Sequence, residues 1–317
     1  MDNKLKEALG MYDLTSSKVD LIRHNENVTY KVTDGGNTYV LRIHQPADGF
    51  SLDMLHKGFG KLELIQNEMK AIINLACNTD ILLQQPIYNG DGDFVAVLSC
   101  GTPVTLLSWV EGETLETLEM TGELFFTIGK TIADMHKYLS ICNQKYARFS
   151  YDQSLLPSIS EQICLATMSN ALTEPQSQTI HAVIAEIERR LNELDQTGLQ
   201  KHIVHSDLYK SNIVHNNGVI TPIDFSLCGY AHFYLDIAAV LSYCKSDGSK
   251  QSLLEGYRSS RKVEINPYFI EPYSALESLL FFACQHKRAH EWDWWHEVVE
   301  NACEKEFEPL VIKQFRG

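Results

Sequence analysis

The segment "HIVHSDLYKSNIVHNNGVITPIDF", residues 202–225, places His205, Asp207, Asn212 and Asp224 among apolar runs that are typical of buried strands. Burying a polar or charged group costs free energy unless the group is paired or hydrogen-bonded. Two strand-like runs, "HIVH" and "NIVH", flank "SDLYKS", and a third run, "VITPIDF", follows the turn "NNG". A hairpin-like arrangement of these runs brings Asp207, Asn212 and Asp224 to one end of the strands.

Three oxygen-bearing side chains at one place suit a hard cation such as Mg²⁺, which keeps several waters and bridges phosphates. Phosphoryl transfer uses such a set, because one Asp positions and deprotonates the attacking hydroxyl while an Asn and a second Asp hold the metal. A polar turn network in an ordinary core is the other interpretation, since Asp and Asn favour turns and caps.

Composition limits the classes of partner. The chain has 317 residues, of which 44% are hydrophobic, so it can bury a sizeable core and form two lobes. Its formal net charge of -14 and its lack of Lys or Arg runs argue against a nucleic-acid partner. No apolar run is long enough to span a membrane, and the eight cysteines form no C-x-x-C pair. We therefore expect a cytoplasmic protein with reduced thiols and no membrane partner.

The first third of the chain reads as an antiparallel sheet with one inserted helix. The strands "KVDLIR", "VTYKV" and "TYVLRI" fill residues 18–43, and "DGGN" between the last two is a hairpin signal. "FVAVLS" and "VTLLSWV" predict two more strands. Between them and the first three strands, helical spacing predicts a helix over 61–77, with an apolar stripe at Leu62, Ile65, Met69, Ile72 and Ile73.

Helices dominate after "EGETL". An apolar stripe predicts an amphipathic helix over 123–139, and further helix is expected over 158–195 and 273–307. The boundary between a small α+β lobe and a helical lobe falls near residue 109.

One set of residues resembles a known family, and it reads His205-x-Asp207-x-x-x-x-Asn212, then Ile223-Asp224-Phe225, then Asp236 in "YLDIA". It is similar to the aminoglycoside phosphotransferase and choline kinase family of small-molecule kinases. The resemblance implies an α+β, protein-kinase-like bilobal fold. Residues 1–108 would form a nucleotide-binding N-lobe with a small antiparallel sheet and one inserted helix, and residues 109–317 a larger, mainly helical C-lobe.

The resemblance also implies roles. Asp207 would be the catalytic base for the acceptor hydroxyl, and Asn212 and Asp224 would bind the magnesium ion that accompanies ATP. His205 would support the turn through a backbone bond. Asp236 would brace the catalytic loop, although by local chemistry it is also a reasonable N-terminal helix cap.

On the nucleotide side, the family places the phosphates under the loop between the first two strands. Here that loop is "HNEN", which has no glycine-rich motif, and the backbone amides of Glu26, Asn27 and Val28 would cap the phosphates. A plain hairpin loop explains this segment equally well. The hinge that binds adenine would be "LLSWVEG", through backbone groups from Ser108 to Val110.

Arg42 in "YVLRI" stands where the family usually has a Lys for the α- and β-phosphates, and Glu68 on the inserted helix is its expected partner. Arginine keeps the charge and can bridge phosphate and carboxylate. Its different reach puts the catalytic rate in question more than nucleotide binding. The alternative is that Arg42 is a strand-surface residue.

The sequence indicates the identity of the acceptor molecule less clearly than the nucleotide site. "HEWDWWHE" at 290–297 interleaves aromatic and acidic residues and could hold a cationic acceptor, or some of its Trp side chains could be core while others cover a groove. We expect an ATP-dependent phosphotransferase that acts on a hydroxyl of a small molecule: an aminoglycoside, a choline-like amino alcohol, an amino acid or a sugar. The alternatives are a nucleotide-binding pseudokinase that regulates a partner, and a kinase that acts on protein Ser or Thr.

Overall fold

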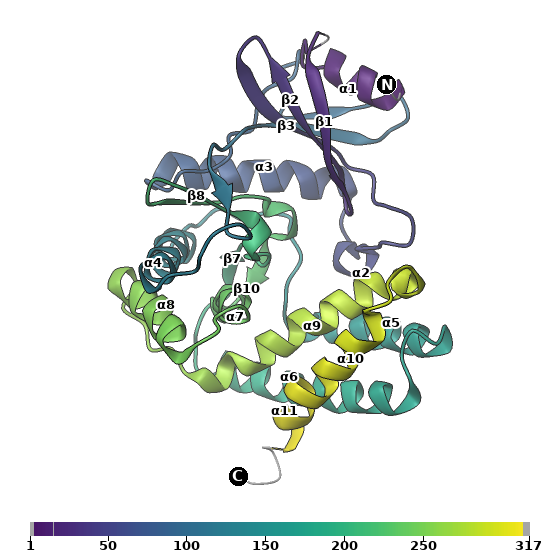
Figure 1. The fold of residues 1–317 in the computed structure, drawn as a ribbon, viewed down its shortest axis with the longest axis vertical. Helices are drawn as coiled ribbons and strands as arrows, with labels where there is room; N and C mark the ends of the chain where they lie inside the picture. Colours follow the sequence, from purple (N-terminus) through teal and green to yellow (C-terminus); the bar gives the residue numbers. More distant parts are fainter. Residues whose placement is uncertain (1–2, 15, 313–317) are drawn as a thin grey trace.

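The structure, a computed structural model, describes residues 3–14 and 16–312 and has a sheet-containing N-lobe above a larger helical C-lobe (Figure 1). The N-lobe contains a five-stranded antiparallel sheet in the order β1-β2-β3-β5-β4. Its elements are α1 Asn3–Gly10, β1 Lys18–His24, β2 Val28–Asp34, β3 Asn37–Ile43, α2 Asp53–His56, α3 Lys61–Asn78, β4 Val95–Val97 and β5 Pro103–Ser108. The predicted antiparallel sheet with an inserted helix is confirmed.

The hairpin between β2 and β3 follows from its turn residues. Asp34 pairs with Asn37, and the two residues between them, Gly35 and Gly36, have φ of 54° and 89°. Positive φ at both positions costs glycine little, so this two-residue turn fixes the register of β3. The register places Arg42 between Thr29 of β2 and Thr105 of β5, in the middle of the sheet.

Helix α3 joins the lobes through its apolar face. Ile65, Met69 and Ile72 pack in one cluster with Leu107 of β5 and with C-lobe residues such as Phe225. The predicted stripe is wrong at Leu62, which is 38% exposed, because the buried face turns through Leu64 and Glu68 instead.

The C-lobe is mainly helical, as predicted. Its elements are β6 Glu113–Thr114, α4 Gly122–Leu139, α5 Leu156–Met168, α6 Glu174–Gln196, β7 His202–Val204, β8 Ile213–Asn216, β9 Val219–Pro222, β10 Gly229–Ala231, α7 Tyr234–Leu241, α8 Asp247–Ser260, α9 Glu271–Gln285, α10 Trp295–Ala302 and α11 Glu308–Ile312. A Thr173 capping box starts α6, so the expected helix over 158–195 is in fact two helices.

The predicted hairpin of the catalytic segment is correct only for β8 and β9. These strands pair with each other, and β6 adds to the outer edge of β8. β7 instead pairs with β10, a strand that the sequence pattern did not indicate. The division of the chain at residue 108 stays a prediction.

Two N-lobe helices were not expected. α1 packs Leu5, Ala8 and Leu9 into the cluster that contains Leu41 and Val104 of the sheet. α2 is a four-residue helix within the connection that reads as polar and irregular. Both are too short for their periodicity to stand out from the sequence.

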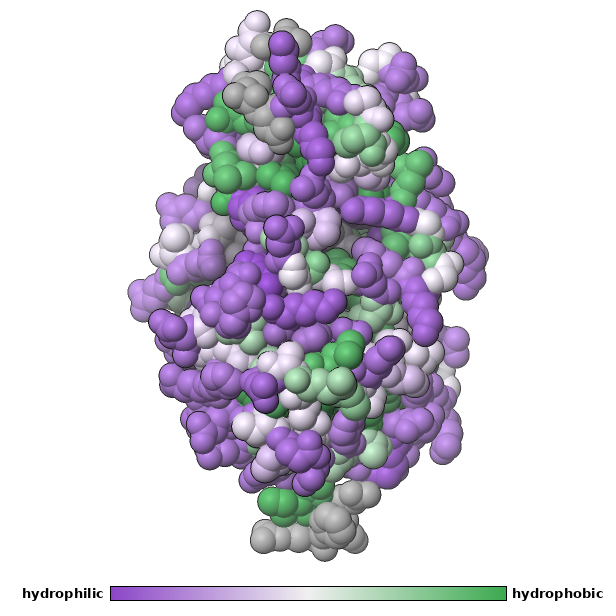
Figure 2. All heavy atoms as spheres, turned by 90° about the vertical axis from the view of Figure 1, so that its right-hand side faces the viewer, coloured by the Kyte–Doolittle hydropathy of each residue, from purple (hydrophilic) through white to green (hydrophobic). Residues whose placement is uncertain are grey.

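Hydrophilic residues cover most of the face drawn in Figure 2, in keeping with the acidic composition. Over residues 3–14 and 16–312, no helix combines the length and the apolar character that crossing a membrane requires.

The close approach of α4 and α8 in the C-lobe depends on glycine. A Cβ at Gly129 would lie 2.1 Å from the carbonyl oxygen of Leu253, and one at Gly256 would lie 2.0 Å from that of Phe126. Gly129→Ala is therefore expected to push the helices apart and to cost about 1–3 kcal/mol of unfolding free energy. Thermal unfolding followed by circular dichroism should show a melting temperature lower by about 2–10 °C.

Gly10→Ala is the matched control, because nothing lies within 4 Å of a Cβ there. An equal melting temperature for Gly129→Ala and the control would contradict the close packing of α4 and α8.

Candidate active site

Asp236 holds the loop that follows β7. Its carboxylate accepts hydrogen bonds from the backbone N–H groups of His205 (2.9 Å) and Ser206 (2.6 Å), and Nε2 of His136 lies 2.8 Å from Oδ2. Ser206 has φ of 59°, a left-handed conformation that these bonds fix. Asp236 lies in the first turn of α7, after Phe233 at the cap position, and caps no helix amide. The capping interpretation of Asp236 is therefore wrong, and the carboxylate braces the loop.

His205 joins this loop to the strand before Asp224. Its Nε2 lies 3.0 Å from the Ile223 carbonyl oxygen, and the Asp207 amide donates to Nδ1 at 3.3 Å. Burial lowers the pKa of His205, although Asp236 and Asp224 oppose the shift. A neutral ring that donates from Nε2 and accepts at Nδ1 satisfies both contacts.

Asp207 and Asn212 lie side by side. Nδ2 of Asn212 donates to the backbone oxygen of Asp207 at 3.0 Å and to its Oδ2 at 2.6 Å. Both amide protons are used in this way, and Oδ1 of Asn212 is buried with no hydrogen-bond partner among the described residues. The free oxygen of Asn212 is therefore available to a ligand.

Asp224 presents a second buried oxygen that accepts no hydrogen bond, although the guanidinium of Arg42 lies 3.4 Å from it. It adopts a left-handed conformation with φ of 66°, immediately before the 3₁₀ turn Phe225–Leu227. Oδ2 contacts the guanidinium of Arg23, whereas Oδ1 accepts no hydrogen bond from the described part of the chain. Burial opposes ionisation of Asp224, but Arg42 and Arg23 outweigh it and hold its pKa well below the usual range.

Arg42 links β3, helix α3 and the turn that carries Asp224. Its Nη1 lies 2.7 Å from Oε1 of Glu68 on α3 and 3.4 Å from Oδ1 of Asp224. Arg42 is 2% exposed and Glu68 is 1% exposed, so the strand-surface interpretation of Arg42 is wrong. The structure brings Arg42, Glu68 and Asp224 together as one buried network.

The environment of the Asp207 carboxyl disfavours its ionised form. Burial raises its pKa well above the usual value, and the charges of Asp224 and Glu26 add to the rise. Positive charge placed at the neighbouring oxygens of Asn212 and Asp224 would lower the pKa again.

The loop between β1 and β2 reaches into the site through Glu26. Its Oε1 accepts from the Ser226 hydroxyl and, at 3.0 Å, from Nδ2 of Asn27, which is 7% exposed. The backbone amides of Glu26 and Asn27 donate to no acceptor in the described ranges, whereas Val28 already belongs to β2. Two of the three amides expected to cap phosphates are thus free to do so.

At the expected hinge, β5 ends and two amides are already used. Ser108 donates its N–H to Gln85 at 2.8 Å, and Trp109 donates to Thr38 at 3.1 Å. Val110 donates to no protein acceptor within residues 3–14 and 16–312, so its amide is the free hinge donor.

Several site residues escaped the sequence analysis. Arg148 bonds to the carbonyl oxygens of Cys228 (2.6 Å), Leu64 (3.0 Å) and Ser226, and so ties α3 to the loop after Asp224. His136, Arg23 and Glu277 were also missed, and Glu26 was expected to act only through its backbone amide. A buried Arg or His has no spacing pattern, and no signal in the sequence would have found them.

A cavity of about 600 Å³ opens beside Asp207 and extends between the β1–β2 loop and helices α9 and α10. Of the three Trp side chains in "HEWDWWHE", Trp294 lines this cavity and is 43% exposed. Trp295 is fully buried, and its Nε1 donates to the Ala171 carbonyl at 2.8 Å. The interpretation that some are core and others cover a groove is therefore correct.

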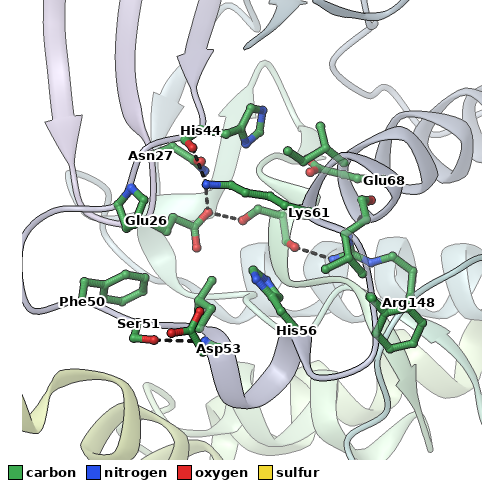
Figure 3. A pocket seen from close by; sticks show the side chains of 16 residues that line it. Glu26, Asn27, His44, Phe50, Ser51, Asp53, His56, Lys61, Glu68 and Arg148 are labelled. Carbon is green, nitrogen blue, oxygen red and sulfur yellow. Dashed lines mark hydrogen bonds between the residues drawn. The ribbon is translucent and has the colours of Figure 1, made fainter. Parts of the chain in front are cut away.

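A second cavity of about 440 Å³ lies on the other side of Glu26, against α2 and α3. Figure 3 shows Glu26, Asn27, His44, Lys61 and Glu68 around it. Glu26, Phe50 and Leu52 line both cavities.

The set of oxygens suits a divalent cation that also binds phosphate. Residues 3–14 and 16–312 contain no cluster of three or more His, Cys, Asp or Glu side chains that could hold a metal ion alone. Oδ1 of Asn212 and Oδ1 of Asp224, which accept no hydrogen bond, fit a cation that takes its other ligands from a nucleotide and water.

The pKa of Glu26 gives a testable pH dependence. Burial, followed by the charge of Asp224, raises this pKa from 4.5 to about 7. The folded protein thus binds this proton more tightly than the unfolded chain, and it loses stability as pH rises from about 4.5 to 7. Without divalent cations, Glu26→Gln should melt at least about 2 °C above the unsubstituted protein at pH 8 but not at pH 5. A difference that is the same at both pH values would contradict the shifted pKa.

Comparison with known proteins gives one family. A sequence profile described as "Phosphotransferase enzyme family" matches residues 19–265. Amicoumacin kinase of Bacillus subtilis (strain 168) is 24% identical over 244 residues, which are 75% of this chain. The match spans 66% of that protein, slightly less than two thirds of its length.

Two solved structures share the fold. A microcompartment-associated aminopropanol kinase has a TM-score of 0.76 at 19% identity, over 97% of this chain and 98% of its own. An amicoumacin kinase in complex with AMP-PNP, Ca²⁺ and Ami has a TM-score of 0.73 at 20% identity, over 96% of this chain and 94% of its own. The predicted protein-kinase-like bilobal fold is confirmed. Because the profile covers more than half of the chain, this protein belongs to the phosphotransferase enzyme family, as the motif from His205 to Asp236 predicted.

Proposed function

We propose that this protein is an ATP- and Mg²⁺-dependent phosphotransferase that moves the γ-phosphate to a hydroxyl of a small molecule. One observation carries the proposal: Asp207 faces the 600 Å³ cavity, close to two buried oxygens that accept no hydrogen bond, Oδ1 of Asn212 and Oδ1 of Asp224. A hydroxyl in this cavity would lie next to a base and next to a place for phosphate and its cation.

Asp207 is the proton acceptor in this proposal. Its Oδ2 is held by Asn212, which fixes the direction in which the carboxylate presents its other oxygen. The acceptor hydroxyl donates to Asp207 and is oriented toward the γ-phosphorus. It would transfer its proton to Asp207 as its oxygen bonds to the γ-phosphorus, while the bond from that phosphorus to the β,γ-bridging oxygen breaks and ADP leaves. Positioning of the hydroxyl and stabilisation of charge supply most of the rate enhancement in such reactions.

Arg42 and the β1–β2 loop would hold the nucleotide. Arg42 can turn two of its donors to the α- and β-phosphates while Glu68 keeps the guanidinium in place. The free amides of Glu26 and Asn27 would bond the phosphates, and the free amide of Val110 would bond adenine.

Asn212 Oδ1 and Asp224 Oδ1 would hold the magnesium ion. Bound there, the ion would neutralise charge on the β- and γ-phosphates. Asp224 is suited to this place because its low pKa keeps it ionised.

The acceptor is proposed to be a small molecule because the cavity is bounded by α9 and α10 and has the volume of a small-ligand site. One relative of the same fold is named for an amino alcohol, aminopropanol, and amino alcohols are a suitable first class to test. A cytoplasmic location is proposed from the eight cysteines, all of which are free.

Asp207→Asn tests the proposal. The variant should lose about 10²–10⁴-fold in kcat, because the amide cannot accept the proton, and should bind ATP as before. Turnover is measured by ATP consumption against amino alcohols, aminoglycosides, amino acids and sugars, and nucleotide affinity by calorimetry.

Asp247→Asn, at an exposed carboxylate on α8, is the control and should keep full activity. Undiminished turnover in Asp207→Asn would overturn the role of this residue. ATP binding without turnover on any acceptor in the unsubstituted protein would favour a nucleotide-binding regulator.

Arg42→Met tests the buried network. Removing the guanidinium leaves Glu68 and Asp224 buried without it, at a cost of about 3–5 kcal/mol of unfolding free energy. Urea unfolding should show this loss, and ATP affinity should fall with it. Arg42→Lys keeps the charge and should recover most of both quantities. Equal stability of Arg42→Met and the unsubstituted protein would contradict the network.

A further inference from the structure

The end of β1 turns a charged side chain inward and two apolar side chains outward. β1 is the edge strand of the five-stranded sheet. Leu21 and Ile22 are 61% and 48% exposed, whereas the side chain of Arg23, which follows them, is 35% exposed and contacts the C-lobe residue Asp224. Exposing apolar groups while removing a guanidinium from water lowers stability. The arrangement therefore indicates a requirement other than folding.

A bulge in β1 produces this arrangement. Leu21 and Arg23 pair with consecutive residues of β2, so Ile22 is an extra residue without a partner. Arg23 pairs with Thr29, and Thr29 pairs in turn with Arg42 of β3. Directly paired residues share one face of a sheet, so the bulge puts Arg23 on the same face as Arg42. Bulges beside active sites commonly re-aim a side chain in this way.

The two arginines occupy different places at Asp224. Arg23 donates from Nη2 to Oδ2 of Asp224, whereas Nη1 of Arg42 lies 3.4 Å from Oδ1. Arg42 is buried against Glu68 of α3. Arg23 lines the cavity of about 600 Å³ together with Asp207, and it is the one Arg or Lys among the described lining residues. Arg23 is thus the cation on the side of the acceptor hydroxyl.

The guanidinium of Arg23 keeps donors for a ligand. Nη2 is bonded to Asp224, but within the two described ranges, residues 3–14 and 16–312, Nε and Nη1 donate to no acceptor. A guanidinium presents its N–H groups in a planar fork that matches two oxygens of a phosphate. Because the side chain is partly exposed and lines the cavity, these donors are accessible to a bound phosphoryl group.

The loop that follows Arg23 is held in place by the connection after β3. The backbone oxygen of Asn25 accepts a hydrogen bond from the Ala47 amide at 2.6 Å, and Nε2 of His24 lies 3.2 Å from the Gln45 oxygen. These bonds fix the end of β1 over the site without a ligand. Donors that are already in place lose little conformational freedom when a charged group binds to them.

We propose that Arg23 is a catalytic residue whose free guanidinium donors bind the γ-phosphoryl group while this group passes from ATP to the acceptor. The inference rests on the proposed function and adds a residue that lies outside the motif from His205 to Asp236.

The proposed step conserves every proton. The acceptor oxygen bonds to the γ-phosphorus, its proton goes to Asp207, the bond to the β,γ-bridging oxygen breaks, and ADP leaves. Negative charge on the three peripheral phosphoryl oxygens is then stabilised by hydrogen bonds from Arg23, which keeps its own protons. In the alternative, Arg23 only neutralises Asp224 until a cation binds there, and its removal would change nucleotide or cation binding rather than the transfer.

Arg23→Met tests the proposal with two measurements on the full-length chain. With ATP, Mg²⁺ and the best acceptor of the panel above, kcat should fall about 10²–10³-fold, as for the loss of one preorganised donor to a transition state. By calorimetry, ADP and Mg²⁺ with aluminium fluoride, which mimics the phosphoryl group in transfer, should bind more weakly by a similar factor. ADP and Mg²⁺ without fluoride should bind as before.

Lys18→Met is the matched control, because this cation lies on the same strand, is 75% exposed and pairs with Asp20. It should leave both measurements unchanged. Urea unfolding checks that the variants are folded. If Arg23→Met does not fold, Arg23→Lys decides: it keeps a charge but has no planar fork, so a fall in kcat and a matching fall in aluminium fluoride affinity are expected.

Unchanged kcat in a folded Arg23→Met, or a loss of kcat with full aluminium fluoride affinity, overturns the inference and leaves the proposed function intact. Equal weakening of ADP binding with and without fluoride also overturns it, because Arg23 would then serve the nucleotide or its cation alone. Absence of turnover by the unsubstituted protein on every acceptor would count against the proposed function instead.

Discussion

The buried contact of Arg42 with Glu68 and Asp224 is the interaction on which the site depends. It joins β3 of the sheet, α3, and the C-lobe turn that carries Asp224, at 2.7 Å and 3.4 Å. Such a contact between buried charges is tolerated only when each charge is compensated. Arg148 strengthens the same junction by bonding the backbone of α3 and of the turn after Asp224. Together they fix the distance between the two lobes where a nucleotide would lie.

In the C-lobe half of the site, few positive charges lie beside the acidic side chains. Asp224 and Glu277 are buried and Asp207 is half-buried. The charges of Arg42 and Arg23 act on Asp224 and that of Arg23 acts on Asp207, whereas the charges that act on Glu277 are acidic. A folded protein can keep such acidic groups when a bound ligand supplies the positive charge that the neighbouring residues lack. The oxygens of Asn212 and Asp224 suit a metal with phosphates, whereas Glu277 lines the cavity that Asp207 faces.

Much of the fold and of the catalytic loop could be predicted because their signals are local. "DGGN" specifies the hairpin between β2 and β3. The motif from His205 to Asn212 contains Asp207 and Asn212, which are five residues apart and whose side chains form a hydrogen bond. Local signals also have limits, because the first-turn position of Asp236 allows a cap or a brace, and only the packed loop decides between them. Arg148 bonds to segments about 80 residues away, and β7 pairs with β10 across the catalytic segment. No spacing within the sequence encodes such contacts.

The proposed function depends most on the cation site, which Oδ1 of Asn212 and Oδ1 of Asp224 would form. Crystals grown with AMP-PNP and Mn²⁺, a Mg²⁺ substitute with usable anomalous scattering, test it directly. We expect an anomalous peak within about 2.0–2.3 Å of Asn212 Oδ1 and of an Asp224 oxygen, next to the phosphates of the nucleotide. Nucleotide bound with no anomalous peak at these oxygens, or a peak held by other residues, would contradict it.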